Sequence, residues 1–102
     1  MAFIMVTSKI PPHKTEEVGQ AFLGKKAPDI ADFVKRVNIW VVADYETKTY
    51  ALYEVPNDKM WEGYLSIATR YAGYRMIEGY KYKIEPLATI QEALPMIGLG
   101  KK

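Results

Sequence analysis

Residues 34–55 read VKRVNIWVVADYETKTYALYEV and carry the strongest structural signal in the chain. Residues 34–44 begin with polar and apolar residues in alternation and become continuously apolar from residue 39, which predicts a strand. Residues 49–55 are rich in aromatic and β-branched side chains, which favour a second strand. Because only the polar residues 45–48 separate the two, we expect an antiparallel hairpin.

The segment before the hairpin predicts a strand followed by a helix. Residues 3–7 form an apolar run without a helical period, and a pair of prolines ends it. A helix is expected from about residue 13 or 14 to residue 26, with glutamates in its first turn and lysines in its last, where the helix dipole favours them. Pro28 then ends this helix.

The segment after the hairpin predicts a second helix and a fourth strand. The helix is expected at residues 59–71, and the strand at residues 80–85, where aromatic or aliphatic side chains alternate with charged ones until Pro86 ends the strand. Thr89 and Glu92 form a capping-box pattern that predicts a short C-terminal helix. Helical spacing places the following residues on the buried face of the second helix: Trp61, Tyr64, Leu65, Ala68, Tyr71 and Ala72.

The order of these elements predicts the fold class. A βαββαβ order is typical of the α+β, ferredoxin-like plait, in which a four-stranded antiparallel sheet carries two helices on one face. The chain has 102 residues, and chains divide into domains only well beyond ~250 residues. We therefore expect residues 1–102 to form a single domain, with the C-terminal helix and tail beginning at about residue 89.

Several of the predicted strands are apolar or aromatic on both faces. Two helices cover only one face of the sheet, and a strand that is apolar on both sides needs cover on both sides. Aromatic residues make up 13% of the chain, 8 of them tyrosine, and a small domain hides only roughly two-thirds of its surface. The simplest second cover is another copy of the chain, so we expect a homodimer that packs through its sheet faces.

The charge, cysteine and hydropathy patterns exclude several kinds of partner and site. Lys plus Arg is 14 and Asp plus Glu is 12, and these charges are interspersed rather than clustered into a nucleic-acid footprint. The chain has no cysteine, which fits a cytoplasmic location, and no apolar stretch near the ~20 residues that span a bilayer. One histidine and no cysteine leave only carboxylates as metal ligands. We expect no metal, no cofactor, no nucleic acid and no membrane partner.

RNA-recognition modules share this order of strands and helices, so their signature is a relevant comparison. Their third strand carries K/R-G-F/Y-G/A-F-V-x-F/Y, and residues 48–55 match it only at Lys48, Tyr50 and Ala51. The glycine is missing, and Leu52 stands where the second stacking aromatic belongs. RNA binding is therefore an alternative that needs an exposed aromatic sheet face, which a dimer through that face would remove.

Two segments, PDIADFVKRV at residues 28–37 and EGYKYKIEP at residues 78–86, resemble the second-strand entry and the last strand of the dimeric α+β barrel superfamily. The element order, the length and the two-sided strands are similar to that superfamily as well. The resemblance implies a homodimer with facing sheets and a ligand cleft between each sheet and its own helices. It implies either a small aromatic-lined ligand cleft of unassigned function or, alternatively, a cofactor-independent monooxygenase or isomerase acting on a small aromatic or polyketide-like compound.

His13 is the one histidine of the chain and the candidate catalytic residue. It follows the first strand, where a loop opens toward the first helix, and an imidazole suits proton transfer near neutral pH. The alternative interpretation is an exposed histidine near the start of a helix.

The candidate ligand-binding residues are Asn38, Trp40, Tyr53, Trp61, Tyr64 and Tyr71. The first two share one face of the second strand, where an amide and an indole together suit a flat organic ligand. The three from the second helix predict a pocket between that helix and strands two and three. An aromatic stripe at helical spacing is also what a packed core shows, and an indole also fills a core or a dimer interface. Both interpretations remain open from the sequence.

Overall fold

The computed structural model describes residues 1–23 and 29–99 and follows the predicted order of elements. The predicted last turn of the first helix, together with Pro28, lies outside the described residues. The elements are β1 (Ala2–Ile10), η1 (Pro12–Lys14), α1 (Thr15–Leu23), β2 (Lys35–Val42), β3 (Thr47–Val55), η2 (Asn57–Lys59), α2 (Met60–Ala72), β4 (Lys81–Leu87), α3 (Ile90–Ala93) and η3 (Leu94–Ile97), where η marks a 3₁₀ turn.

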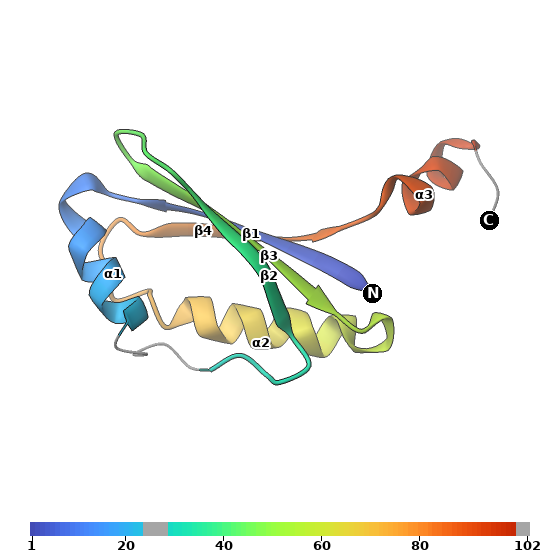
Figure 1. Cartoon of the computed structure of the whole chain (residues 1–102), viewed down its shortest axis with the longest axis horizontal. Coiled ribbons are helices and arrows are strands. Elements are labelled where there is room, and N and C mark those ends of the chain that lie inside the picture. Colours follow the sequence, from blue (N-terminus) through green and yellow to red (C-terminus); the bar gives the residue numbers. More distant parts are fainter. Residues whose placement is uncertain (24–28, 100–102) are drawn as a thin grey trace.

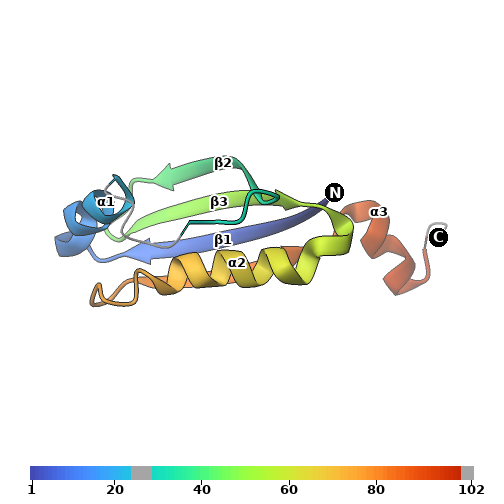
Figure 2. The same ribbon diagram turned by 90° about the horizontal axis from the view of Figure 1, so that it is seen from below.

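The four strands form one antiparallel sheet in the order β2-β3-β1-β4 (Figure 1). This is an α+β architecture, and its strand order is compatible with the ferredoxin-like plait. The predicted hairpin is confirmed as β2 and β3, which pair antiparallel across residues 43–46. Figure 2 shows α2 running along one face of the sheet and α1 beside the end of the sheet at which β1 finishes.

The fourth strand runs further than the sequence suggested. β4 includes Pro86, which pairs with Ile4 of β1, and ends at Leu87. The prediction that Pro86 ends the strand is therefore wrong. Proline has no N–H to donate to a ladder, but an edge strand such as β4 has one side without a partner strand. A proline nitrogen that faces this outer side removes no ladder hydrogen bond.

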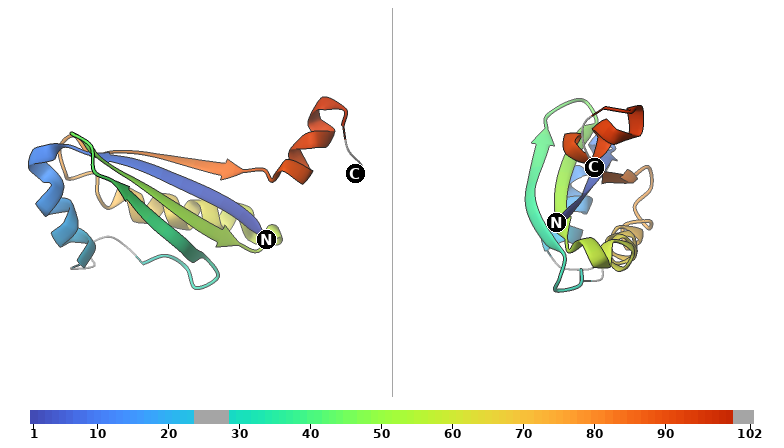
Figure 3. Two further views of the ribbon diagram at one scale, coloured as in Figure 1. Left: turned by 45° about the horizontal axis from the view of Figure 1, so that its top comes forward. Right: turned by 90° about the vertical axis from the view of Figure 1, so that its right-hand side faces the viewer.

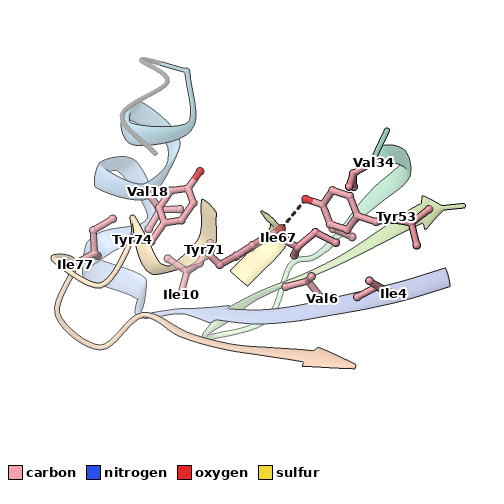
Figure 4. Packing of buried hydrophobic residues seen from close by; sticks show 12 residues of the cluster. Ile4, Val6, Ile10, Val18, Val34, Tyr53, Ile67, Tyr71, Tyr74 and Ile77 are labelled. Carbon is pink, nitrogen blue, oxygen red and sulfur yellow. Dashed lines mark hydrogen bonds between the residues drawn. The ribbon is translucent and has the colours of Figure 1, made fainter. Parts of the chain in front are cut away.

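The core lies between the helices and one face of the sheet (Figure 4). Every second residue of β1 and β3 faces this side, so that Ile4, Val6, Ala51 and Val55 are at most 1% exposed. Ile67 completes the layer from the side of α2 and has no exposed surface. Full burial of an aliphatic side chain stabilises a fold by roughly 1.5–3 kcal/mol, so these few residues account for a large part of its stability.

α2 buries a different stripe from the one that its apolar spacing suggested. Gly63, Ile67 and Tyr71 are buried, whereas Trp61 is 66% exposed and Leu65 is 45% exposed. The predicted buried face is therefore wrong at Trp61 and Leu65, although it is right at Tyr71. Apolar side chains lie around most of this helix, so periodicity alone does not select one stripe. The glycine selects it, because a position without a side chain lets the helix backbone approach the sheet closely.

The other face of the sheet, which we call the open face, has none of the described helices over it (Figure 3, right). Strand pairing arranges its residues in four rows, each running from β2 to β4. The middle rows are Asn38-Leu52-Met5-Glu85 and Trp40-Tyr50-Thr7-Lys83, and the outer rows are Lys35-Glu54-Phe3-Leu87 and Val42-Lys48-Lys9-Lys81. The centre of the open face is therefore apolar and aromatic, whereas its charges lie toward the edges and ends.

The chain after β4 leaves the body of the domain. The expected capping box is confirmed, because the Thr89 hydroxyl accepts a hydrogen bond from the Glu92 N–H at 3.2 Å while the Glu92 carboxylate accepts one from the Thr89 N–H at 2.8 Å. α3 has only about one turn, since η3 follows it directly with a proline at its start. Figures 1 and 3 show α3 beyond the end of β4 and away from the sheet.

Candidate functional site

A cavity of about 350 Å³ lies between the sheet, α1 and the C-terminal end of α2. Its apolar walls come from three elements: Ile10 of β1, Val18 and Phe22 of α1, and Ile39 and Val41 of β2. The last two face the cavity together because alternate residues of a strand point to the same side. The wall is thus made by the same alternation that makes β2 apolar on both faces.

Two pairs of hydroxyl groups form much of the polar lining. The hydroxyl oxygens of Tyr53 and Tyr71 lie 3.0 Å apart in a buried hydrogen bond (Figure 4), and the hydroxyls of Ser8 and Thr49 form a second bond between β1 and β3. A hydroxyl has one hydrogen to donate and two lone pairs to accept with. The Tyr53–Tyr71 pair therefore keeps one hydrogen that a ligand in the cavity can accept, whereas the Ser8 hydroxyl also hydrogen-bonds to the Tyr80 hydroxyl.

Further tyrosines pack around Tyr71 at one end of the cavity. The centroid of its ring lies 6.5 Å from that of Tyr53, 6.0 Å from that of Tyr74 and 5.7 Å from that of Tyr82. Tyr80 joins the cluster through Tyr74, with 5.3 Å between the ring centroids. Aromatic pairs at such separations contribute about 0.5–1.5 kcal/mol each beyond the area they bury. The cluster fixes Tyr71 in place and so holds its hydroxyl toward Tyr53.

Burial makes these phenols hard to ionise. It raises the pKa of Tyr80 to about 12 and raises the pKa of Tyr71 well above its usual range. Burial also raises the pKa of Tyr74, although the positive charges of Arg70 and Arg36 oppose this shift. A phenol with a raised pKa stays protonated at neutral pH, so the cluster offers O–H donors rather than phenolate bases.

We expect the free energy of unfolding to fall as the pH rises above about 10. An unfolded tyrosine ionises near pH ~10, whereas the pKa of folded Tyr80 is about 12. Below pH ~10 both states keep the proton and the stabilisation is fully present; above it, the unfolded state loses the proton first and becomes favoured. Each such tyrosine then lowers stability by about 1.4 kcal/mol per pH unit. Urea unfolding at a series of alkaline pH values measures this slope.

Two conservative variants isolate the tyrosine contribution to that slope. Tyr80→Phe removes the ionisable group and should flatten the fall of stability between pH ~10 and ~12, where Tyr74, Tyr53 and Tyr82 are the neighbouring phenols. Tyr45→Phe is the matched control, because Tyr45 is 84% exposed and its substitution should leave the slope unchanged. Lysine ionisation is common to all of these proteins and cancels in the comparison. An identical slope for Tyr80→Phe and the parent would mean that burial does not retain this proton.

The structure separates the predicted ligand-binding residues of α2. Tyr71 lines the cavity together with Tyr53 of β3. Trp61 and Tyr64 lie near the opposite end of α2, where their rings stack with centroids 5.7 Å apart and line a separate groove of about 530 Å³ against β4. In the same turn of α2, Gly63 brings the helix backbone against Val55 of β3. The hollow beside Trp61 and Tyr64 therefore opens toward β4 and not toward strands β2 and β3.

The other three predicted site residues lie away from the cavity. Asn38 and Trp40 are on the open face, where Trp40 pairs with Tyr50 across the hairpin and is 46% exposed. His13 lies in η1, where it is exposed and is not part of the described cavity lining. The cavity therefore contains neither the amide, nor the indole, nor the imidazole that the sequence singled out.

Sequence reasoning missed two arginines of the cavity. Arg36 and Arg70 both line it, and their guanidinium carbons lie 5.4 Å and 6.0 Å from the centroid of the Phe22 ring. Arg36 reaches this side because the register shifts between Arg36 and Asn38, with Val37 as the extra residue of a β-bulge. Plain alternation puts residues 36 and 38 on one face, so no pattern in the sequence reveals this orientation.

The described residues offer neither a metal-binding cluster nor a membrane-crossing helix. Within residues 1–23 and 29–99, no three His, Cys, Asp or Glu side chains gather into a group that could hold a metal ion. None of the helices in that part of the chain is both long and apolar enough to cross a membrane. The chemical groups at the site are those of the cavity itself: apolar walls, hydroxyls and guanidinium groups.

Comparison with known proteins supplies no relative for this chain. No protein-family model matches it, and neither a curated protein nor a solved structure matches it. What the structure itself shows is a small α+β domain with a four-stranded antiparallel sheet and helices.

Proposed function

We propose that this protein is a homodimer of the dimeric α+β barrel type that binds a small, flat organic ligand between its sheet and its helices. The observation that carries the proposal is the cavity of about 350 Å³, which has apolar walls from three elements and hydroxyl groups among its lining. Ligand sites are typically concave, mostly apolar pockets of ~300–1,000 Å³ with a few placed polar groups. The strand order and the apolar centre of the open face support the barrel and the dimer.

The lining favours binding over catalysis. The described residues around the cavity include no carboxylate and no imidazole, so a cofactor-independent monooxygenase or isomerase would lack a general base there. Burial holds the pKa of Tyr71 and that of Tyr80 above their usual range, so these phenols do not serve as bases either. Ligand binding is thus the function that this geometry supports best.

We expect Gly19→Leu to block ligand binding without disturbing the fold. Gly19 lines the cavity from within α1, and a Cβ at this position meets nothing within 4 Å. A leucine there extends into open space and takes up volume that the ligand needs. The probe is 2-naphthamide, a flat neutral compound, followed through the NMR signals of the Tyr53 and Tyr71 rings. These signals should shift in the parent, and the affinity should fall by roughly tenfold or more in the variant.

Gln20→Leu is the matched control for this experiment. Gln20 is the next residue of α1, is exposed and is not part of the described lining, so the same side chain is added outside the cavity. The control should bind 2-naphthamide as the parent does, and thermal unfolding should show that both variants are folded. The proposal is contradicted if millimolar probe leaves the parent's tyrosine signals unmoved, or if Gly19→Leu binds it as well as the parent does.

A further inference from the structure

The charged side chains that line the cavity, among the described residues, are all positive. The described residues that line it include two guanidinium groups, those of Arg36 and Arg70, and no carboxylate. Both groups lie at the Phe22 ring, with their central carbons 5.4 Å and 6.0 Å from its centroid. Arg70 also hydrogen-bonds to the Tyr74 side chain within the protein. The described lining contains no acid beside Arg36, and a bound anion would neutralise the charge of Arg36.

Arg36 is the arginine whose position points most directly to a charged ligand. It is exposed at the rim of the cavity, and the ion pairs among the described residues join other side chains, Lys14 to Glu17 and Lys48 to Asp44. Its direction depends on the β-bulge at Val37, which gives up regular pairing at that point. Bulges are common beside binding sites, where they re-aim a side chain. The backbone thus departs from regular geometry at the residue that brings a positive charge to the cavity.

The uncharged polar groups of the lining also favour a ligand with hydrogen-bond acceptors. The Tyr53–Tyr71 pair keeps one O–H hydrogen to donate. A guanidinium group donates hydrogen bonds and accepts none. With no carboxylate in the described lining, donors outnumber strong acceptors, so the complementary ligand carries acceptor oxygens with negative charge.

We infer that the ligand is a flat apolar molecule bearing a carboxylate, which Arg36 binds while the ring system lies against Ile39 and Val41. This inference rests on the proposed function, because it names the chemical class of the ligand for the same cavity. A planar guanidinium binds a carboxylate through two parallel hydrogen bonds, which fixes the orientation of the ligand as well as its charge. The apolar wall of β2 then receives the uncharged end.

The test compares 2-naphthoate with 2-naphthamide, which share their ring system and differ in charge. The parent should bind the carboxylate roughly tenfold more tightly than the amide, and Arg36→Gln should lose most of this preference while still binding the amide. Arg75→Gln is the matched control, because exposed Arg75 donates to the Ala72 carbonyl and is not part of the described lining. Both variants lose one positive charge, so non-specific attraction of the anion changes equally in the two.

The possible outcomes distinguish this inference from the proposed function. If neither probe binds the parent, the proposed function fails and the inference fails with it. If both probes bind equally and Gly19→Leu blocks both, the cavity is a ligand site but a carboxylate ligand is the wrong class. If the preference for 2-naphthoate persists undiminished in Arg36→Gln, the guanidinium of Arg36 is not its source and the inference is overturned.

Discussion

The Leu52→Lys variant is expected to sediment as a monomer of 11.7 kDa, whereas the parent protein should sediment at twice that mass. Leu52 lies in a middle row of the open face, between Asn38 of β2 and Met5 of β1. A face-to-face dimer buries this position against the partner sheet. A lysine there has no described carboxylate directly beside it on the neighbouring strands. Sedimentation equilibrium at micromolar concentration measures the difference.

The expected effect is large because a two-fold interface repeats every substitution. Each subunit contributes the same surface patch, so one change introduces two lysines into the interface. Leaving a charge buried without a partner costs several kcal/mol. The dissociation constant should therefore rise by roughly a thousandfold or more, well beyond micromolar concentration.

The charges of the open face favour one orientation for this dimer. Lys9, Lys48 and Lys81 occupy one outer row, whereas the other outer row carries Glu54 together with Lys35, and Glu85 lies in the middle row next to it. A two-fold axis perpendicular to the strands places the lysine row of one copy over the glutamates of the other. An axis parallel to the strands would bring the two lysine rows together, and opposed like charges are costly at interfaces. The first arrangement is therefore the one that we expect.

Leu23→Lys is the control for the dimer experiment. Leu23 is 75% exposed at the end of α1, away from the open face, so this variant should remain a dimer. Circular dichroism of Leu52→Lys should show that the sheet is intact. A monomeric parent would contradict the argument from two-sided strands. The aromatic open face would then be accessible to other partners, and binding of a single-stranded oligonucleotide would revive the RNA hypothesis.

The sequence predicts the elements well where one pattern dominates. The strict alternation of residues 80–85 puts Tyr82 and Ile84 on the same side of the strand, as expected, and the structure pairs them with Ser8 and Val6. The hairpin and the capping box at Thr89 are local signals and are confirmed as well. The strand that continues through Pro86 and the buried stripe of α2 are not local, because neighbouring elements decide both. Those two features are where the predictions are wrong.

The candidate site is harder to predict because the sequence does not show which face of β2 turns toward the helices. Tyr53 and Tyr71 are found at the cavity, since each belongs to the buried side of its element. β2 is apolar on both faces, so its sequence does not show which face turns toward the helices. Asn38 and Trp40 therefore lie on the open face, whereas the bulge turns Arg36 the other way. A one-residue change of register reverses the side that a side chain faces, and sequence alone does not show where a bulge occurs.

Gly63→Ala and Gly19→Ala are expected to change the free energy of unfolding in opposite directions. Both glycines lie within helices, where alanine is favoured over glycine by roughly 0.5–1 kcal/mol. Nothing lies within 4 Å of a Cβ at Gly19, so Gly19→Ala should raise the free energy of unfolding by about that amount. A Cβ at Gly63 would lie 2.7 Å from Cγ1 and 3.3 Å from Cβ of Val55. Urea unfolding of the two variants at equal protein concentration measures both changes.

Gly63→Ala is expected to lower the free energy of unfolding because Val55, the residue that the new Cβ would contact, is stiff. Val55 is fully buried in β3 and has a short, branched side chain, so it has little freedom to move aside. Overpacking of this kind costs about 1–3 kcal/mol, which exceeds the helix-propensity gain and makes Gly63→Ala destabilising. In the double variant with Val55→Ala the clash is removed, so its destabilisation should be smaller than the sum of the two single effects. Strict additivity, or a stabilised Gly63→Ala, would mean that close helix–sheet approach does not select the buried stripe of α2.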